Sequence, residues 1–228
     1  MKKITIGFDV YGTLVDPIEI SVYLQSLIGN KAIPFAEIWR QKQLEYTFRR
    51  GLMNQYQNFD ICIQQAMQFA AECLDVSFPS KEEENLLNLY SNLKVFPDVV
   101  PAFELLKQNN HTLVAFSNGV ESTLNTLLSN AGLINYLADI ISVDKLQTFK
   151  PNPKVYRYLA LKTDADPADC WVISSNPFDV IGGKSAGLNA AWIQRDPSNI
   201  FDPWEYAPDI TAKNLVEFSK LLNRSSHS

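Results

Sequence analysis

Polar residues whose side chains can take part in a reaction follow several apolar runs of this 228-residue sequence. Asp9 ends the run KITIGF, Ser117 and Asn118 follow HTLVAF, and the polar group Ser174–Asn176 follows CWVI. Lys150 lies in TFKP, shortly after a fourth apolar run. A carboxylate beside a cation stays ionised and can attack carbon or phosphorus, or act as a base. The residue types therefore indicate chemistry based on a carboxylate nucleophile, provided that the fold brings them together.

Each residue also has an ordinary structural explanation when it is taken alone. An aspartate after a strand is commonly a helix N-cap, and Ser-Asn at a strand end is typical turn chemistry. Lys150 before a proline is consistent with a solvated loop, and Arg40 in IWRQKQLEYTFRR is consistent with a charged helix face. The functional interpretation rests on the ordered occurrence of all the strand-end groups along one sheet.

Strand-like apolar runs alternate with helical stretches, and this alternation predicts an α/β fold with a doubly wound parallel sheet, a Rossmann-like core. Strands are expected at residues 3–10, 111–118, 138–143, 170–176 and 190–194. Helices are expected between them, at 120–132, 152–163 and 178–187, with a last helix at 213–223. Ligands on such sheets bind beyond the carboxyl ends of the strands, where the polar residues stand.

Four helical stretches with no strand between them separate the first expected strand from the others. They lie at about 17–29, 35–50, 57–74 and 80–92. Their place in the chain predicts an inserted helical cap domain at 16–94, which would cover the strand ends and exclude water. The core domain is then 1–15 and 95–228, and residues 224–228 are expected to form a disordered tail.

Composition narrows the class of protein. Hydrophobic residues make up 46% and charged residues 20%, which is typical of a globular chain, and the net charge is -5. This charge disfavours nucleic acid and anionic membranes as partners. The N-terminus does not read as a signal peptide and no segment reads as a membrane span. Three cysteines without a C-x-x-C motif are expected to be free thiols, which favours the cytoplasm.

The ordered motifs resemble those of the haloacid dehalogenase superfamily over nearly the whole chain. The motifs that carry the resemblance are FDVYGTLVD, WRQKQLEYT, FSNG, FKP with Tyr156 beyond it, and SSNPFD. Within the superfamily, the chain is most similar to the type II L-2-haloacid dehalogenases. The resemblance implies hydrolysis of short L-2-haloalkanoic acids to D-2-hydroxy acids through an aspartyl ester, without a cofactor.

Two positions distinguish this chemistry from that of the phosphatases in the same superfamily. The phosphatases carry a second aspartate where this chain has Tyr11, whose pKa near 10 makes it a poor acid at neutral pH. They also hold Mg²⁺ with an acid where this chain has Ser175. A halide needs no proton to leave, so the sequence favours displacement at carbon and predicts that no metal is bound.

The resemblance implies a role for each matched residue. Asp9 is the nucleophile, Arg40 and Asn118 receive the halide, and Ser117, Lys150 and backbone amides near Tyr11 hold the substrate carboxylate. Lys150, Asn176 and Asp179 position and activate water, and the supporting residues are Thr13, Tyr156 and Ser174. An apolar pocket in the cap is expected from Trp39, Leu44 and Phe59. The same resemblance implies a homodimer acting on a small 2-haloacid.

One position departs from the family pattern. Members of the family tend to carry tryptophan beside the last-motif aspartate, where this chain has Phe178, and Pro177 follows Asn176. Phe178 is therefore expected to alter the shape of the substrate pocket. Which halogen is preferred, including whether fluoride is released, stays open.

Three other functions remain alternatives. The chain could be a phosphatase with altered motifs, or a non-catalytic binding module on the same fold. The retention of Asp9 and Lys150 disfavours the binding module. A hydrolase using Ser117 with His111 is disfavoured because His111 precedes its strand, at the end away from the expected site.

Overall fold

The computed structural model describes residues 3–225, which contain a parallel sheet in the order β3-β2-β1-β4-β5-β6. The strands are β1 (Thr5–Phe8), β2 (Thr112–Ser117), β3 (Asp139–Ser142), β4 (Cys170–Ser174), β5 (Asn189–Ile193) and β6 (Ile210–Ala212). The doubly wound sheet predicted from the sequence is confirmed. The short edge strand β6 was not predicted, and it extends the sheet beside β5.

Strand β1 lies at the centre of the sheet, where the strand order reverses. It pairs in parallel with β2 on one side and β4 on the other, so Phe8 lies opposite both Ala115 and Ile173. All four residues of β1 are buried, as expected for a central strand covered on both faces. Asp9 therefore leaves the sheet between the ends of β2 and β4, at the position where such sheets bind ligands.

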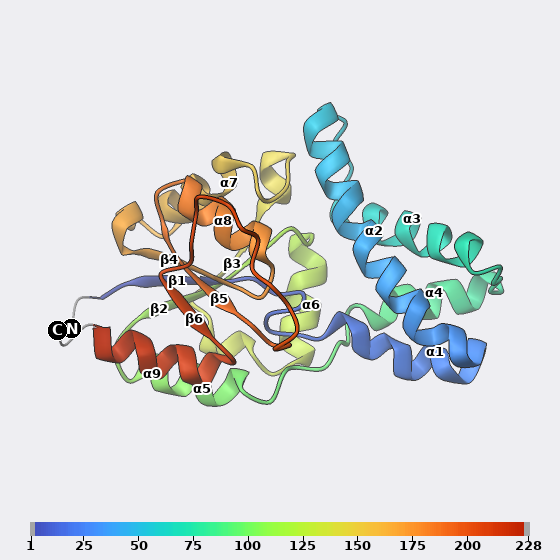
Figure 1. Cartoon of the computed structure of the whole chain (residues 1–228), viewed down its shortest axis with the longest axis horizontal. Helices are drawn as coiled ribbons and strands as arrows, with labels where there is room; N and C mark the ends of the chain where they lie inside the picture. The colour runs from blue at the N-terminus through green and yellow to red at the C-terminus, as the bar shows by residue number, and fades with distance from the viewer. Residues whose placement is uncertain (1–2, 226–228) are drawn as a thin grey trace.

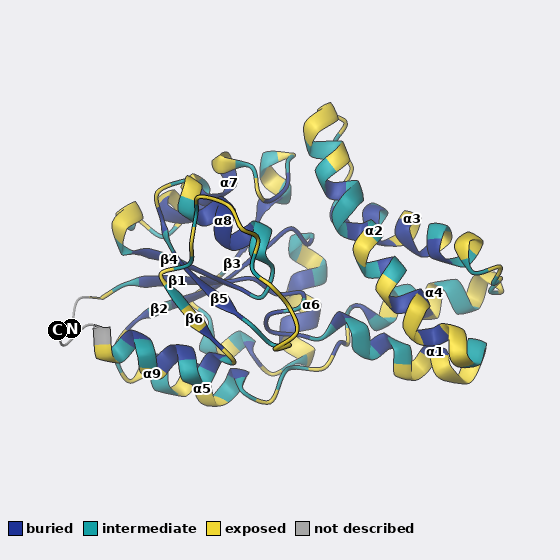
Figure 2. Cartoon of the chain, in the orientation of Figure 1, coloured by how far each residue is buried: buried dark blue, intermediate teal, exposed yellow. Residues whose placement is uncertain are grey.

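Helices cover both faces of the sheet. Figure 1 shows α5 and α9 on one side and α7 and α8 on the other. The bounds of the core helices are α5 (Val99–Lys107), α6 (Glu121–Asn130), α7 (Pro153–Lys162), α8 (Pro177–Ser185) and α9 (Leu215–Ser225). Two apolar clusters result, one containing Phe103 and Phe218 and the other containing Val155 and Val172. Figure 2 shows the strands buried between these layers.

The segment after β1 folds into helices α1 (Ile20–Ile28), α2 (Ala32–Met53), α3 (Phe59–Cys73) and α4 (Ser80–Leu89). Figure 1 shows them grouped at one end of the molecule, beyond the sheet. Asn58 caps α3 by accepting a hydrogen bond from the backbone N–H of Ile61, and Trp39 of α2 donates its indole N–H to the Ile63 carbonyl at 2.8 Å. The four predicted helical stretches all form, and α2 is longer than predicted.

Single-turn 3-10 helices complete the chain at η1 (Pro17–Glu19), η2 (Gly29–Lys31), η3 (Ile134–Tyr136), η4 (Val143–Leu146) and η5 (Pro167–Asp169). The predicted tail at 224–228 begins inside α9, which is helical to Ser225, and residues 226–228 lie outside the described residues. Across the described part of the chain, no helix combines the length and apolar character that crossing a bilayer requires.

Contacts connect the α1–α4 group to the sheet domain. The Tyr56 hydroxyl donates to Asp144 in η4, and Thr123 of α6 donates to Asp60 at the start of α3, at 2.8 Å. The Phe48 ring of α2 meets Phe178 of α8 edge to face, with the centroids 5.1 Å apart. The helices are therefore seated on the edge of the sheet where Asp9 lies.

Candidate active site

The Asp9 carboxylate is held by donors from three segments of the chain. Its Oδ2 accepts hydrogen bonds from Thr13 Oγ1 at 3.0 Å, Ser174 Oγ at 3.2 Å and Asn176 Nδ2 at 2.7 Å. Its Oδ1 accepts from the Lys150 ammonium at 3.2 Å. Four donors, one of them cationic, therefore hold both oxygens of the Asp9 carboxyl group in one orientation. A carboxylate held in this way is a candidate nucleophile.

Lys150 is buried, with only 1% of its surface exposed. Besides Asp9, its ammonium donates to the Phe116 carbonyl at 2.7 Å and to Asp179 Oδ2 at 2.8 Å, and it lies 4.2 Å from the Phe116 ring centroid. All three of its donors therefore have partners. This pairing offsets the large cost of removing an ammonium group from water, and it joins two carboxylates through one cation.

Asp179 is fully buried and also accepts a hydrogen bond from the Tyr156 hydroxyl at 2.8 Å. Burial raises the pKa of the Asp179 carboxyl, with the Lys150 charge opposing the shift. Burial and the Asp179 charge raise the pKa of Tyr156 well above its usual value, so the phenol stays a donor. A Cβ atom at Gly182 would lie 2.3 Å from the Tyr156 hydroxyl oxygen, so only glycine permits this contact.

The turn after β1 is tied to the turn after β4. Thr13 Oγ1, which donates to Asp9, accepts a hydrogen bond from the backbone N–H of Ser175 at 2.9 Å. Gly12 adopts a φ of +89°, a conformation that favours glycine. The YGT sequence of the motif therefore forms a turn that directs the Thr13 hydroxyl back to Asp9.

Arg195 also contacts the turn after β1, and the sequence did not indicate a role for this residue. It donates to the Thr13 carbonyl and pairs with Asp98 at 3.0 Å, and its guanidinium lies 3.7 Å from the centre of the Phe96 ring. Asp98 also accepts from the backbone N–H of Leu215 at the start of α9. The ion pair thus joins the turn after β1, residues 9–15, to the body of the core; we call this turn the nucleophile turn after the candidate nucleophile Asp9.

Arg40 reaches the site from helix α2. It donates to the Tyr11 carbonyl at 3.0 Å and to Gln43 at 3.4 Å. Burial lowers the pKa of the guanidinium, and the neighbouring Asp9 charge acts in the opposite direction. Among the described residues, Arg40 has no carboxylate within ion-pair distance. Its positive charge is therefore available to an anion that enters the site.

Ser117 and Asn118 lie at the same edge, at the end of β2. The Ser117 hydroxyl accepts from the backbone N–H of Gly119 at 3.1 Å, and Asn118 Oδ1 accepts from the backbone N–H of Lys150 at 2.9 Å. Both side chains are buried. Asn118 therefore fixes the position of the loop that carries Lys150. The sequence motifs did not indicate this contact.

The apolar residues predicted from the cap occupy different environments. The Tyr11 ring lies 5.4 Å from the Phe59 ring, and its buried hydroxyl has no hydrogen-bond partner among residues 3–225. Trp39 is fully buried against Tyr90, with centroids 4.8 Å apart. Leu44 is half-buried on α2. Tyr11 and Phe59 thus form a contact beside the nucleophile turn, while Trp39 packs inside the helical group.

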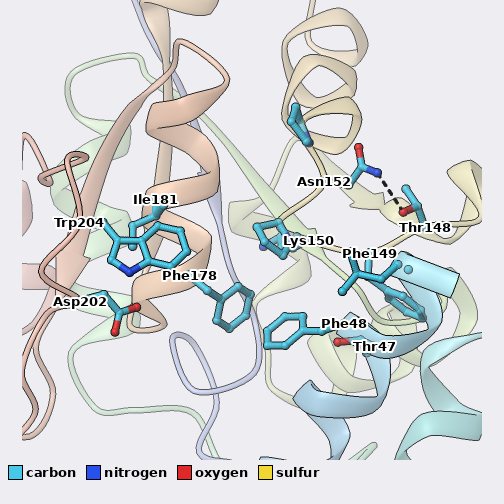
Figure 3. Close-up of a pocket in the computed structure, with 14 residues that line it drawn as sticks. Thr47, Phe48, Thr148, Phe149, Lys150, Asn152, Phe178, Ile181, Asp202 and Trp204 are labelled. Carbon is cyan, nitrogen blue, oxygen red and sulfur yellow. Dashed lines mark hydrogen bonds between the residues drawn. The ribbon is translucent and has the colours of Figure 1, made fainter.

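A cavity of about 580 Å³ opens between α2 and the sheet domain, next to Lys150 (Figure 3). Phe178 and Lys150 line it, whereas Trp39, Leu44 and Phe59 do not. The residues around it that the sequence did not indicate include Thr47, Phe48, Leu52 and Trp204. The first three lie on α2 and Trp204 lies far along the chain between β5 and β6, so only the fold brings them together.

The donor set around Asp9 does not suit a divalent metal ion. Across residues 3–225, no group of three or more His, Cys, Asp or Glu side chains is arranged to hold one. The Lys150 ammonium contacts both Asp9 and Asp179, so a cation is already built into the protein there. Ser175 supplies a hydroxyl where a hard cation would require a carboxylate.

The fold and the site define an α/β enzyme of the doubly wound class with an aspartate as its candidate nucleophile. The model of the haloacid dehalogenase-like hydrolases matches residues 5–187. The chain belongs to this family of hydrolases.

Individual relatives agree with this assignment. The chain is 31% identical to an (S)-2-haloacid dehalogenase of Pseudomonas sp. (strain YL), over 97% of this chain and 95% of the relative. It is 33% identical to haloacetate dehalogenase H-2 of Moraxella sp. (strain B), over 92% and 94%. The L-2-haloacid dehalogenase of Xanthobacter autotrophicus superposes with a TM-score of 0.89 at 27% identity, covering 97% of this chain and 99% of that one.

Proposed function

We propose that this protein hydrolyses L-2-haloacids to D-2-hydroxy acids through an ester on Asp9. The observation that carries the proposal is the Asp9 carboxylate, fixed by four donors and joined to Asp179 by a buried lysine. The named relatives support it. One structure of the Xanthobacter enzyme, 26% identical to this chain with a TM-score of 0.89, has chloropropionic acid covalently bound.

In the first step an Asp9 oxygen attacks C2 of the substrate from the side opposite the halogen. The new O–C2 bond forms as the carbon–halogen bond breaks, and the bonding electron pair leaves with the halide. Arg40 receives this anion, with Asn118 nearby, because a guanidinium without a carboxylate partner stabilises developing negative charge. Ser117, Lys150 and backbone amides near Tyr11 hold the substrate carboxylate.

In the second step water attacks the carbonyl carbon of the Asp9 ester. Asp179 accepts a proton from the water, and its raised pKa makes it a stronger base than an ordinary carboxylate. The bond between that carbon and the ester oxygen breaks, the released oxygen takes up a proton, and the 2-hydroxy acid leaves with inverted configuration. Asn176 and Lys150 position the water, while Thr13, Ser174 and Tyr156 hold the carboxylates in place.

We further propose that residues 16–94 form a cap domain that closes over the site and excludes water. The protein acts as a homodimer in the cytoplasm on a small haloacid, not on nucleic acid. It needs no metal ion, so dehalogenation should be unchanged by EDTA and by added Mg²⁺. Activity that returns only with Mg²⁺ would assign the site to metal-dependent chemistry instead.

Racemic 2-chloropropionate tests the reaction. About half of the chloride should be released at exhaustion, with D-lactate as product and the D-substrate left over. A phosphate ester such as p-nitrophenyl phosphate should not be hydrolysed. Equal consumption of both enantiomers, or turnover of the phosphate ester alone, would contradict the proposal.

A single turnover in H₂¹⁸O with excess enzyme tests the role of Asp9. The hydroxyl oxygen of the product comes from Asp9 in the ester route, so the first product should be unlabelled. The peptide containing Asp9 should gain one heavy oxygen. A labelled first product with unlabelled Asp9 would show that Asp9 is a base that directs water at C2.

A further inference from the structure

Gln43 is a fully buried glutamine in the middle of helix α2. It lies in a row of buried residues spaced four apart, with Phe35 and Trp39 before it and Thr47 after it. This spacing places the four side chains on one face of the helix, where an apolar residue is the usual choice. A buried amide costs free energy unless its oxygen and nitrogen are hydrogen-bonded. The reason for a glutamine at this position therefore lies in its partners.

The partners of Gln43 fix the orientation of its amide. Its Oε1 accepts a hydrogen bond from Arg40 Nη1 at 3.4 Å, and its Nε2 donates to the Tyr90 hydroxyl at 2.6 Å. A guanidinium can only donate, so the amide oxygen is the atom that must face Arg40. The amide nitrogen then points to Tyr90, whose hydroxyl can accept. Arg40, Gln43 and Tyr90 thus form a chain whose hydrogen-bond directions are set by chemistry.

Tyr90 is a rigid and neutral end to this chain. It directly follows helix α4 and is buried, and its ring centroid lies 4.8 Å from that of Trp39 and 6.3 Å from that of Tyr11. Burial raises the pKa of Tyr90 to about 12, while the hydrogen bond from Gln43 and the charge of Arg40 act in the opposite direction. The phenol therefore stays uncharged at neutral pH, and its aromatic packing keeps the hydroxyl in place for Gln43.

Both acceptors that hold Arg40 are neutral. Its Nη2 donates to the Tyr11 carbonyl at 3.0 Å and its Nη1 donates to Gln43, so the planar guanidinium is held at two points. The bond to Gln43 is long, so it orients the guanidinium without binding it tightly. Within residues 3–225 no carboxylate pairs with Arg40. These supports therefore orient the positive charge and leave it uncompensated.

We propose that Gln43 is a positioning residue for Arg40, anchored on Tyr90, and that its neutral amide preserves the positive charge that receives the departing halide. This inference rests on the proposed function, in which Arg40 binds the halide. Arg40 and Gln43 are three residues apart on α2 and Tyr90 follows α4, so the chain is built within the helical group. The guanidinium is thus oriented before the substrate arrives, and a preorganised donor of this kind stabilises charge that develops in a reaction.

Gln43→Met tests the orienting hydrogen bond, because methionine has a similar length and volume but no amide. It should lower kcat/KM for L-2-chloropropionate by about tenfold, the effect expected when one hydrogen bond is lost. Chloride is a poorer leaving group than bromide and depends more on the cation, so the loss should be severalfold smaller with L-2-bromopropionate. A general disturbance of the fold would lower both values alike. Equal losses for the two substrates would therefore overturn the proposal.

Gln43→Glu tests the neutrality of the amide. Glutamate has nearly the same shape but places a carboxylate opposite Arg40, so the guanidinium pairs within the protein and is withheld from the halide. We expect a loss of about 100-fold or more in kcat/KM, comparable to that of Arg40→Ala. The control is Gln64→Glu, which makes the same change at an exposed glutamine of α3 and should have little effect. Activity of Gln43→Glu close to that of the wild type would contradict the role of the neutral amide.

Tyr90→Phe removes the anchor and keeps the aromatic packing, so it tests the chain without changing α2. It should reproduce the greater loss with chloride than with bromide that Gln43→Met shows. The double variant should be no slower than Gln43→Met alone, because both substitutions act through the orientation of Arg40. Losses that multiply in the double variant would show that Tyr90 and Gln43 act independently, which would overturn the proposed anchor.

Bromide binding separates this inference from the proposed function. Anomalous diffraction from crystals soaked in sodium bromide should show the anion beside Arg40 in the wild type and not in Gln43→Glu. Halide release by the wild type with bromide beside Arg40 in both proteins, or in neither, would overturn the inference and leave the function standing. Bromide beside Arg40 in the wild type alone, without halide release from any L-2-haloacid, would support the role of Gln43 and refute the function.

Discussion

Replacing Lys150 by methionine tests whether one buried cation holds two carboxylates together. Methionine fills a similar volume but leaves Asp9 and Asp179 without the ammonium that lies 3.2 and 2.8 Å from their oxygens. Removing one partner of a buried ion pair typically costs about 3–5 kcal/mol. We expect Lys150→Met to lower the free energy of unfolding by this amount at pH 7.5.

Asp179→Asn completes a double-mutant cycle. Alone, it removes a charged hydrogen-bond acceptor of Lys150 and Tyr156 but leaves the lysine paired with Asp9, so we expect a loss of about 1.5–3 kcal/mol. In the double variant the only remaining carboxylate is Asp9, which keeps its bonds from Thr13 and Ser174. The loss in the double variant should therefore fall short of the sum by about 0.5–3 kcal/mol.

Lowering the pH should reduce the loss in free energy of unfolding that Lys150→Met causes. Burial raises the pKa of the Asp179 carboxyl in the folded protein, and removal of the opposing lysine charge raises it further. A carboxyl whose pKa is higher in the folded state binds its proton more tightly there, so its contribution to stability is present at low pH and is lost as the pH rises through the folded-state pKa. The difference from wild type should thus be largest at neutral pH and smaller near pH 5.

Urea unfolding followed by circular dichroism measures each corner of the cycle, with equal m-values as the check on two-state behaviour. Lys154→Met is the matched control, because Lys154 is an exposed lysine on the adjoining helix α7, and it should change stability by no more than about 0.5 kcal/mol. Losses that add within about 0.5 kcal/mol would show that Lys150 and Asp179 act independently. That result would refute the bridge between the carboxylates.

Three further predictions concern activity. Arg40→Ala should lower kcat/KM for halide release by about 100-fold or more, because the departing anion loses its cation. The control is Arg49→Ala, which removes an exposed arginine of the same helix and should have little effect. Equal effects of the two substitutions would place Arg40 outside the halide site. Activity should fall on acidification through a pKa above the usual carboxyl value of about 3.9, because Asp179 must be ionised to accept a proton; a pH–rate profile that is flat down to pH 4 would exclude it as the base. Arg195→Met should lower kcat about tenfold with little change in KM, because the Thr13 turn loses its support; an effect on KM alone would contradict a positioning role.

The sheet edge that carries the candidate site was predictable because the signals for it are local in the sequence. Asp9 follows an apolar strand and Ser117 and Ser174 each end one, and parallel strands place their carboxyl ends together. Helix α5 was missed because Pro97 and Pro101 interrupt its pattern, although Pro101 lies in the first turn, where a missing backbone N–H is tolerated. Sequence patterns therefore located the strand ends better than the flanking elements.

Contacts between distant segments were not predictable in the same way. Arg195 lies 182 residues from Thr13, and only the alignment of β5 beside β4 brings it to the nucleophile turn. Trp204 reaches the cavity from an irregular segment that has no periodic pattern. The Gly-Gly pair at 182–183 was a local signal left unused, because glycine inside a helix is consistent with a close neighbour, here Tyr156 against Gly182.

The carbonyl oxygen of Tyr11 explains why this site depends on the helices above it. It accepts a hydrogen bond from Arg40 of α2 at 3.0 Å and another from Asn176 at 3.3 Å, and the same Asn176 amide donates to Asp9. The nucleophile turn, the turn after β4 and helix α2 therefore meet at one atom. Because Arg40 is brought to this atom by α2, the positive charge that would receive a halide exists at the site only while the helix covers the sheet edge. The position of the Arg40 charge and the covering of this sheet edge are thus consequences of the same packing of α1–α4 on the core.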